Sequence, residues 1–363
     1  MKKNKNYVDQ KDQPVPEGQH LLEVDDLKMY FHTEDGVVRA VDGVSYTLDR
    51  GETLGVVGES GSGKSVTAMT IMGLISMPPG KIEGGDVRYR GRSILEMTEE
   101  EMQHIRGNDI AMIFQDPMTS LNPVYKIGKQ VGEGLRLHRG YSKQEALKRA
   151  TELLDLVGIP EPEKRVNEYP HQFSGGMRQR VMIAMALACD PDILIADEPT
   201  TALDVTIQAQ IIELMQEMQE KNGNAIIMIT HDLGVVADMA DKIMVMYAGR
   251  PVEFGTAEEI FYESRHPYTW GLIRSIPEQA IDEKKPLTPI HGNPPSLMNL
   301  PEGCVFSPRC PYATDKCRKQ RPERVVTESG HYSACHYSGD PEFLKNAPET
   351  SRTRMDSKKG GEA

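Results

Sequence analysis

Residues 58–65 read Gly58-Glu59-Ser60-Gly61-Ser62-Gly63-Lys64-Ser65. This stretch fits the phosphate-binding pattern G-x-x-x-x-G-K-[ST] at every fixed position. Its glycines allow backbone N–H groups to turn inward around phosphate oxygens, and a helix that starts near Lys64 directs the positive end of its dipole at them. We expect Lys64 to place a charge between the phosphates and the Ser65 hydroxyl to bind Mg²⁺.

The flanking sequence favours a bound nucleotide over a glycine-rich turn without a ligand. The apolar run Thr53–Val57 predicts a buried strand that leads into the loop, and Val66–Ile75 predicts the helix that follows it. Strand, glycine loop and helix in this order are the context that the phosphate-binding pattern requires. We therefore expect the loop to hold the β- and γ-phosphates of a nucleoside triphosphate.

Two acidic residues, Asp197 and Glu198, follow the apolar run Ile193–Ala196. A carboxylate at the end of a strand can hold Mg²⁺ through water, which is the role we expect for Asp197. Glu198 is placed to act as the general base on the water that attacks the γ-phosphate. Taken alone, the pair fits an ordinary acidic loop equally well, but the phosphate loop upstream favours the catalytic interpretation.

Two further polar residues end predicted strands. Gln115 follows Ile110–Phe114, where its amide is expected to contact Mg²⁺ or the attacking water. His231 follows Ala225–Ile229 and is expected to contact the γ-phosphate. A lone glutamine or histidine is more often structural, so both hypotheses depend on the neighbouring motifs.

Ser174, Gly175 and Gly176 open a predicted helix, with Ser174 as its N-cap. The two glycines bring bare backbone N–H groups close to an anion. The alternative is a plain helix cap. Because the phosphate loop already holds the nucleotide from one side, a second phosphate-binding helix start is explained if it serves ATP held by another subunit.

The composition limits the class of partner. Acidic residues number 54 and basic residues 42, for a net charge of −12, which argues against nucleic acid. No apolar run approaches the roughly 18–20 residues that span a bilayer. Residues Met1–His20 lack the apolar stretch of a signal peptide, so we expect a cytoplasmic protein that can dock on a membrane protein.

The pattern of elements predicts an α/β core with a helical insert. Short β-like runs occupy Leu21–Leu48, and apolar strands then alternate with helices, as in a parallel sheet covered on both faces. The expected organisation is a disordered tail over 1–20, a core domain over 21–265 with helices at about 116–188, a proline-rich extension over 266–340, and a disordered tail over 341–363.

Four of the five cysteines fall in the extension, at Cys304, Cys310, Cys317 and Cys335. They lack the close C-x-x-C pairs of most structural zinc sites. Four thiolates at wide spacing suit tetrahedral zinc or an iron–sulfur cluster, and four free thiols are the alternative. The extension has few periodic apolar runs, so we expect a metal to hold it together. Cys189 is expected in the core.

The run Ser174–Arg180 resembles the signature motif of ABC ATPases. With the phosphate loop, Gln115, Asp197-Glu198, Ala202-Leu203-Asp204 and His231, the chain resembles that superfamily over roughly residues 21–265. Further runs are similar to the oligopeptide and dipeptide importer ATPases: Gln115–Pro123, Tyr169–Phe173, and His266–Thr269 with the late cysteines.

The resemblance implies an ABC-type P-loop NTPase with a RecA-like core, an antiparallel β subdomain, a helical insert and a cysteine-containing extension. Two ATPase subunits, usually of related but different sequence, face each other head to tail, with Asp204 at the seam. Tyr30 or Phe31 stacks on adenine, and the sequence does not choose between them. The cysteines carry a [4Fe–4S] cluster, with zinc as the alternative.

The implied function is ATP hydrolysis, with Mg²⁺, that drives peptide import. The partners are a second ATPase subunit, two integral membrane permease subunits that contact residues 116–130, and indirectly an extracytoplasmic peptide-binding protein; nucleic acid is not among them. The chain is expected at the cytoplasmic face of the membrane. The alternative is a soluble ABC-type ATPase in nucleic-acid or iron–sulfur processing. Co-purification with membrane proteins discriminates the two.

Overall fold

The computed structural model describes residues 15–16, 18–116, 120–199, 205–275 and 290–348. Contacts divide the chain into two units, each of which is described by itself. The helical unit contains Met1–Leu22, Thr47–Glu52 and Arg88–Ile227. The phosphate-loop unit contains Glu23–Tyr46, Thr53–Val87 and Met228–Ala363. The predicted tail over 1–20 lies mostly outside the described residues, as does Asp204.

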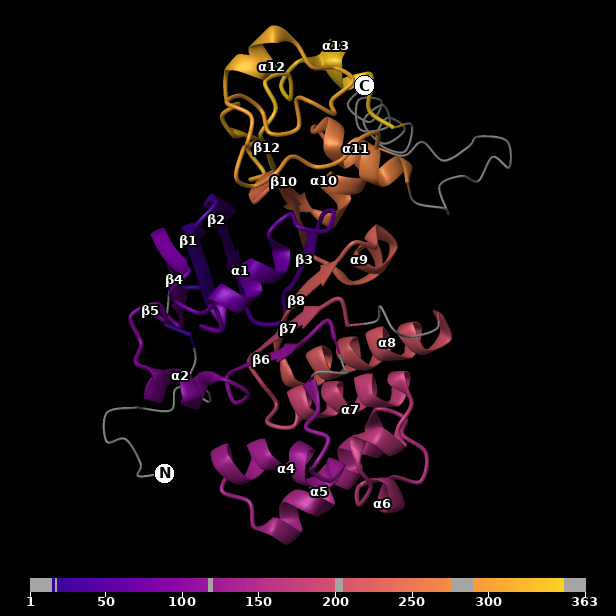
Figure 1. Cartoon of the computed structure of the whole chain (residues 1–363). Coiled ribbons are helices and arrows are strands. Elements are labelled where there is room, and N and C mark those ends of the chain that lie inside the picture. The colour runs from indigo at the N-terminus through magenta and orange to yellow at the C-terminus, as the bar shows by residue number, and fades with distance from the viewer. Residues whose placement is uncertain (1–14, 17, 117–119, 200–204, 276–289, 349–363) are drawn as a thin grey trace. The chain divides into compact units, whose positions relative to one another are not determined.

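Helices are the prominent elements of the helical unit (Figure 1). Its elements are β5 (Arg92–Ser93), α2 (Glu99–Ile105), β6 (Ile110–Ile113), α4 (Ile127–His138), α5 (Lys143–Leu156), α6 (Pro162–Arg165), the 3₁₀ turn η1 (Pro170–Gln172), α7 (Gly175–Leu187), β7 (Ile193–Asp197) and α8 (Val205–Asn222). Helices α4, α5 and α7 pack against one another. The predicted helical insert is therefore confirmed.

Helix α5 begins where its capping sequence predicts. The Glu145 backbone N–H donates to Ser142 Oγ at 3.3 Å, and the Ser142 N–H donates to the Glu145 carboxylate at 2.8 Å. These two bonds satisfy backbone donors that the helix itself leaves without partners. The buried side chains, Ala146, Ala150 and Leu153 among them, recur at helical spacing and turn one face to the other helices.

Strands β6 and β7 pair in parallel, with Ile110 opposite Ile193 and Ile113 opposite Ala196. Every residue of both strands is buried, as the continuous apolar pattern predicts. The carboxyl ends of neighbouring parallel strands meet at one edge of the sheet. Gln115, after β6, and Asp197, at the end of β7, therefore lie at the same edge.

The phosphate-loop unit holds the strand before the loop and the whole extension. Its elements are β3 (Thr53–Val57), α1 (Lys64–Ile71), α9 (Leu233–Met239), β9 (Lys242–Tyr247), β10 (Arg250–Thr256), α10 (Ala257–Tyr262), α11 (Pro267–Arg274), α12 (Asp315–Lys319), β11 (Val325–Val326), β12 (Tyr332–Ser333) and α13 (Pro341–Leu344). Its strands are ordered β3-β9-β10-β12-β11, with β3 parallel to β9.

Four strands have residues in both units: β1 (Leu22–Thr33), β2 (Gly36–Leu48), β4 (Gly80–Tyr89) and β8 (Ala225–Thr230). Within the phosphate-loop unit the first three are ordered β2-β1-β4. The short β-like runs predicted over Leu21–Leu48 form the two long strands β1 and β2. Asp42 lies in the middle of β2 without ending it, because Arg250 Nε donates to the buried Asp42 carboxylate at 2.8 Å.

The extension is not the coreless appendage that its composition predicts. Val305 and Phe306 are buried in one apolar cluster with Val57, Tyr247 and Tyr268. The sequence shows no periodic pattern there because most of this core comes from α9, β9, β10 and α10, and the extension adds one face of the short helix α11 and single side chains. Strand β12 also joins the sheet at β10 (Figure 1).

Two helices occur where irregular chain or a disordered tail is predicted. Helix α11 starts at Pro267, whose fixed φ suits a first helical position, after the N-cap His266. Helix α13 starts at Pro341 after Asp340, which accepts the Glu342 N–H at 2.9 Å. Its Phe343 ring lies 5.3 Å from the Trp270 ring, so the start of the predicted tail packs against α11.

Candidate functional site

The phosphate loop connects β3 to α1, and two of its glycines are fixed by steric limits. A Cβ at Gly58 would lie 2.2 Å from the Met246 carbonyl oxygen, and one at Gly63 would lie 2.3 Å from the Ala40 carbonyl oxygen. Gly63 also has φ 102°, in the region that side chains disfavour. The loop conformation therefore requires glycine at both positions, as the pattern predicts.

The Lys64 ammonium is held inside the loop. Its Nζ donates to the Gly58 carbonyl at 2.7 Å and to the Glu59 carbonyl at 3.0 Å, and the residue is 5 % exposed. Ser62 is buried beside it, at 3.5 Å from Nζ. This arrangement fixes a positive charge at the centre of the loop, where a phosphate group is expected.

The other predicted loop residues remain accessible. Ser60 and Gly61 are exposed, and Ser65 is half-buried in the first turn of α1. A Cβ at Gly61 would meet no atom within 4 Å, although its φ of 75° is also left-handed. The exposed segment 60–61 and the buried Lys64 together leave the loop open to a ligand on one side.

The structure brings Gln115 and Glu198 together in the helical unit. Gln115 Nε2 donates to Glu198 Oε2 at 2.9 Å. Asp197 is buried, and Glu198 is half-buried with φ 48°. Strained backbone of this kind is common at functional sites, where the surrounding structure holds the residue in place.

Ser174 caps α7, as the sequence predicts. The Met177 N–H donates to Ser174 Oγ at 3.3 Å, and both Ser174 and Gly175 are exposed. A Cβ at Gly175 would meet nothing within 4 Å. Gly176 follows as the second helical residue and is half-buried. The helix therefore presents its N-terminal N–H groups at the surface of the unit.

The adenine-stacking candidates Tyr30 and Phe31 are adjacent in β1 and half-buried, so they face opposite sides of the strand. The Tyr30 hydroxyl donates to Asp42 at 3.0 Å. Burial, and then the Asp42 charge, raises the pKa of Tyr30. His231 follows β8 and is exposed. Both candidates and His231 belong to the phosphate-loop unit.

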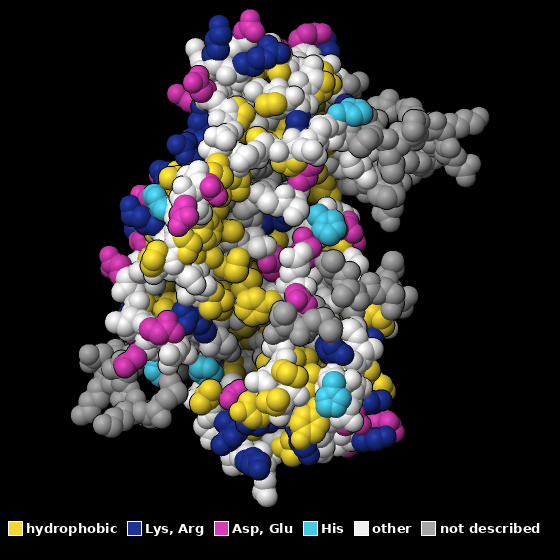
Figure 2. Space-filling view, in the orientation of Figure 1, with side chains coloured by type: hydrophobic (Ala, Val, Ile, Leu, Met, Phe, Trp, Pro, Cys, Tyr) yellow, Lys and Arg dark blue, Asp and Glu magenta, His cyan; other side chains and the backbone are white. Residues whose placement is uncertain are grey.

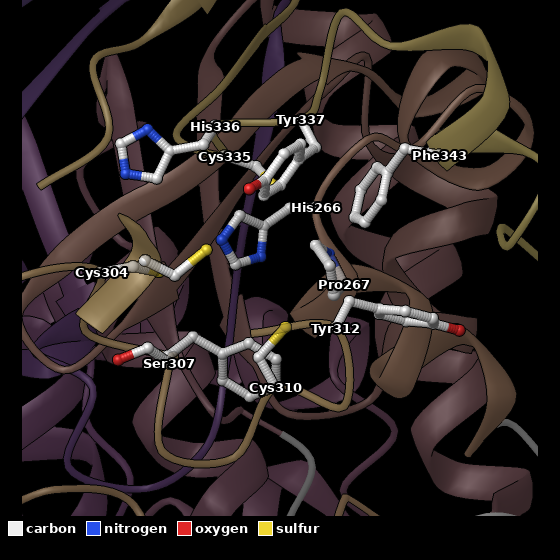
Figure 3. A pocket seen from close by; sticks show the side chains of 12 residues that line it. His266, Pro267, Cys304, Ser307, Cys310, Tyr312, Cys335, His336, Tyr337 and Phe343 are labelled. Atoms are coloured by element: carbon white, nitrogen blue, oxygen red, sulfur yellow. The ribbon is translucent and has the colours of Figure 1, made fainter. Parts of the chain in front are cut away.

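The four late cysteines line one pocket. It is also lined by His266 and by aromatic side chains, namely Phe306, Tyr312, Tyr337 and Phe343 (Figure 3). Burial raises the pKa of Cys310 to about 11 and that of Cys335 to about 12. In the described residues, no three His, Cys, Asp or Glu side chains are arranged to hold a single metal ion. Cys189 is buried in the helical unit, as expected.

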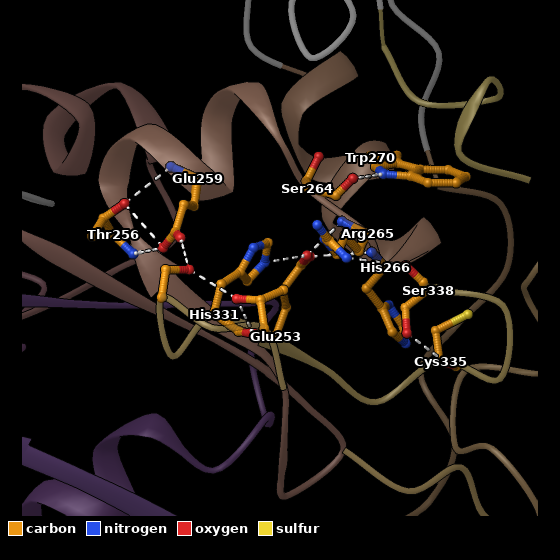
Figure 4. A network of polar contacts seen from close by, with 12 residues as sticks. Glu253, Thr256, Glu259, Ser264, Arg265, His266, Trp270, His331, Cys335 and Ser338 are labelled. Carbon is orange, nitrogen blue, oxygen red and sulfur yellow. Dashed lines mark hydrogen bonds and ion pairs between the residues drawn. The ribbon is translucent and has the colours of Figure 1, made fainter. Parts of the chain in front are cut away.

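A polar network joins β10 to the extension (Figure 4). His331 Nε2 lies 3.0 Å from Glu253 Oε1, and both side chains are buried. The Glu253 carboxylate also accepts the backbone N–H groups of Arg265 and His266. Burial lowers the pKa of His266 to about 4, so this ring is neutral near pH 7. Its Nδ1 accepts the Tyr268 N–H at 3.1 Å, which leaves the hydrogen on Nε2.

Sequence reasoning missed two residues that contact the phosphate loop. The Glu59 backbone N–H donates to the Tyr268 hydroxyl at 2.9 Å, and Arg309 forms an ion pair with the Glu59 carboxylate. Tyr268 belongs to the run His266–Thr269, which resembles the importer ATPases, but the sequence predicts no function for this tyrosine. Nothing in the pattern around Arg309 marks it, because its partner lies 250 residues earlier in the chain.

Comparisons with known proteins agree with the motifs. Residues 41–201 match the ABC transporter family, and residues 252–317 match the family described as oligopeptide/dipeptide transporter, C-terminal region. Among the described residues, no helix has the length and apolar character that crossing a membrane requires.

Curated relatives match over most of their length. The oligopeptide transport ATP-binding protein OppD of Bacillus subtilis is 58 % identical over 86 % of this chain and 87 % of its own. The dipeptide transport ATP-binding protein DppD of Escherichia coli is 52 % identical over 88 % of this chain and 97 % of its own.

A solved structure supports the same fold. It is the dimeric ATP-binding cassette MJ0796, in a post-hydrolysis state bound to ADP and Pi, with a TM-score of 0.60 and 29 % identity over 65 % of this chain and 98 % of its own. The fold is that of an ABC ATPase. More than half of the aligned residues are identical between this chain and each of the two curated relatives, and the alignments cover most of both chains. This chain therefore belongs to the family of ATP-binding subunits of oligopeptide and dipeptide ABC transporters.

Proposed function

We infer that this chain hydrolyses ATP to power the import of oligopeptides or dipeptides through a separate membrane permease. The observation that carries this conclusion is the combination of the phosphate loop with a C-terminal region of the oligopeptide/dipeptide transporter type in one chain. The names of the curated relatives support the same substrate class.

The residues of the site support a direct hydrolysis mechanism. Lys64 and the loop N–H groups hold the phosphates, and the Ser65 hydroxyl and the Asp197 carboxylate are the oxygen donors that Mg²⁺ prefers. Bound Mg²⁺ would neutralise phosphate charge. Glu198 accepts the proton of the attacking water, and Gln115, bonded to Glu198 at 2.9 Å, orients that water. His231 contacts the γ-phosphate.

The exposed start of α7 supports a head-to-tail dimer with a second, related ATPase subunit. Ser174, Gly175 and Gly176 present N–H groups at the surface, where the partner's nucleotide is able to reach them. The similar cassette MJ0796 is described as dimeric with ADP and Pi bound. In this assembly Asp204 lies at the seam between the subunits.

An exposed apolar surface on the helical unit supports docking on two integral permease subunits. Val124 is 71 % exposed and Tyr125 is 44 % exposed, and both lie in the segment 116–130 that is predicted to meet the permease. Figure 2 shows hydrophobic side chains gathered over the region of α4–α6. Such patches mark interaction sites. Docking there places the chain at the cytoplasmic face of the membrane, and the extracytoplasmic peptide-binding protein acts on it only indirectly.

We propose that the cysteine pocket holds a [4Fe–4S] cluster, with zinc as the alternative. A single tetrahedral zinc ion, with Zn–S bonds near 2.3 Å, is the alternative occupant for the same four thiolates. A cluster distributes its thiolates over four irons and so takes a wider set. All four cysteines line this one pocket, together with aromatic side chains.

The experiment that tests the function is a native pull-down of the chain from detergent-solubilised membranes, followed by mass spectrometry and a peptide-uptake assay. The importer predicts recovery of integral membrane proteins and of a second ATPase, and loss of uptake in a Lys64→Ala strain. Recovery of nucleic acid or iron–sulfur proteins without membrane partners would support the alternative, a soluble ABC-type ATPase. The net charge of −12 disfavours that alternative.

A further inference from the structure

Arg309, in the loop between Cys304 and Cys310, reaches the phosphate loop. Its Nη1 lies 2.6 Å from Glu59 Oε2, and its Nη2 lies 3.0 Å from Glu59 Oε1. The Arg309 side chain is 4 % exposed and that of Glu59 is 29 % exposed. A two-pronged pair of this kind fixes the orientation of both groups, which a single contact between flexible surface chains does not do.

The guanidinium itself is rigidly held. Its Nε donates to the His291 carbonyl at 2.9 Å, Nη2 donates to the Ile290 carbonyl at 3.2 Å, and Nη1 lies 3.3 Å from the Tyr247 hydroxyl. The Glu59 carboxylate, foremost among these partners, raises the pKa of Arg309. Each guanidinium nitrogen therefore has a partner, so Arg309 transmits the position of the extension to Glu59.

Glu59 is restrained at three points. Its carboxylate is bound by Arg309, its backbone N–H donates to the Tyr268 hydroxyl at 2.9 Å, and its carbonyl accepts from Lys64 Nζ at 3.0 Å. Tyr268 is fully buried, with its ring 4.6 Å from the Tyr247 ring. Glu59 is the second residue of the loop, so these contacts fix the backbone where the loop leaves β3.

We propose that Arg309 is a positioning residue for ATP, which holds the phosphate loop in its binding conformation through Glu59. A loop that is already in this conformation loses less entropy when it closes around phosphates. Without the two contacts from Arg309, the Glu59 side chain rotates, and the Glu59 carbonyl that accepts from Lys64 shifts with it. The proposal rests on ATP binding at the loop.

The test uses the full-length chain with its partner subunits and compares Arg309→Gln, Arg309→Lys and the parent. We expect Arg309→Gln to raise the Kd for a fluorescent ATP analogue, and the KM for ATP, by about 10-fold, the scale of one hydrogen bond to a charged group. The value of kcat should change less than twofold, because no group that acts on the attacking water is altered. Arg309→Lys should restore only part of the affinity, since an ammonium cannot form the paired hydrogen bonds that the guanidinium makes with the carboxylate.

A matched control separates this role from general loss of charge in the extension. Arg318 pairs with the exposed Asp315 at 3.0 Å and has a 59 % exposed side chain. Arg318→Gln should therefore leave Kd and KM unchanged. An unchanged Kd in Arg309→Gln, or a loss equal to that of Arg318→Gln, overturns the proposal while the parent's ATPase activity still supports the proposed function.

A double-mutant cycle covers the case in which Arg309→Gln weakens the extension itself. Glu59→Gln removes the partner charge from the loop side and leaves the extension intact. If Arg309 acts through Glu59, the double variant loses little more affinity than either single variant. Additive losses, or a lowered Tm with unchanged nucleotide affinity, assign Arg309 a structural role only and refute the proposal.

Discussion

Gly63 shows how one missing side chain sets the geometry of the loop. Its φ of 102° and the 2.3 Å approach of the Ala40 carbonyl leave no room for a Cβ. Gly61 has a similarly left-handed φ of 75° but no atom within 4 Å of a Cβ. The two glycines therefore distinguish backbone strain from steric clash. A side chain at either position would require an unfavourable left-handed backbone, but only a side chain at Gly63 would also collide with a neighbouring atom.

The variant Gly63→Ala should therefore lose stability by about 2 kcal/mol or more and bind ATP poorly, because the backbone must shift to relieve the clash. Gly61→Ala should lose about 1 kcal/mol, from the left-handed backbone alone. Chemical denaturation and nucleotide titration measure the two effects. Equal losses in the two variants would show that the Ala40 contact is not what limits position 63.

Glu198→Gln should keep ATP binding and slow hydrolysis by about 10²-fold or more, the scale of a general base. The glutamine oxygen can still accept the Gln115 amide hydrogen, so the geometry is retained while the proton acceptor is lost. Steady-state ATPase assays and nucleotide titration on the same preparation check this. Hydrolysis at the parent rate would exclude Glu198 as the base.

Ser174→Arg should leave nucleotide affinity at this chain's own phosphate loop nearly unchanged and reduce turnover of the assembled dimer. Ser142→Arg is the matched control, because Ser142 caps α5 through the same bond, also 3.3 Å long. Both lose about 1 kcal/mol of cap stability. Only Ser174 is expected to contact a nucleotide, so equal ATPase rates in the two variants would contradict the head-to-tail arrangement.

At the scale of elements, the strands and helices of the core follow from sequence while those of the extension do not. Strand β3 has the predicted bounds because its apolar run ends at the glycine loop. Helix α1 is predicted to end at Ile75 but ends at Ile71, since Met72 caps it and Gly73 adopts φ 61°. Helix α11 was missed because prolines dominate its surroundings.

Phe306 links the extension to the core, which gives the element-scale prediction. Its ring lies 5.2 Å from Tyr247 and 5.3 Å from Tyr268, and the residue is 2 % exposed. Phe306→Ala should destabilise the protein by about 3–5 kcal/mol, the cost of a large core truncation. Val326→Ala, at a 61 % exposed position, should cost little. Thermal unfolding and limited proteolysis measure the two effects. A lower Tm of the whole protein in Phe306→Ala indicates a core shared with the extension, whereas faster proteolysis of the extension alone indicates an independent appendage.

At the scale of the whole chain, the proposed [4Fe–4S] cluster predicts that the purified protein is coloured. Anaerobically purified protein should be brown, with the broad absorption near about 400 nm that iron–sulfur clusters show. Changing any one of Cys304, Cys310, Cys317 or Cys335 to Ser should bleach it and expose the extension to protease. Cys189→Ser, in the helical unit, is the control and should keep the colour. A colourless protein with zinc bound would favour the zinc alternative.

The nucleotide residues were predictable because each stands in a short contiguous motif beside a strand or helix end. Gln115 and Glu198 meet because parallel neighbours β6 and β7 end at one edge, which the alternation of elements implies. Arg309 and Glu59 meet only through the folded extension, far apart in sequence. No local pattern encodes such a pair, and the choice between Tyr30 and Phe31 likewise depends on which face of β1 meets the ligand.

The pairing of β12 with β10 has a consequence for the chain's solubility. Phe254 lies opposite Tyr332 and their rings are stacked 5.6 Å apart, so the extension covers the otherwise open margin of the sheet. A chain that ended before β12 would expose unpaired backbone groups of β10 beside an aromatic side chain. The buried Glu253 carboxylate would also lose its contact with His331. Uncovered strands of this kind template intermolecular pairing. We therefore expect β12 to protect the β10 edge of the sheet from intermolecular pairing.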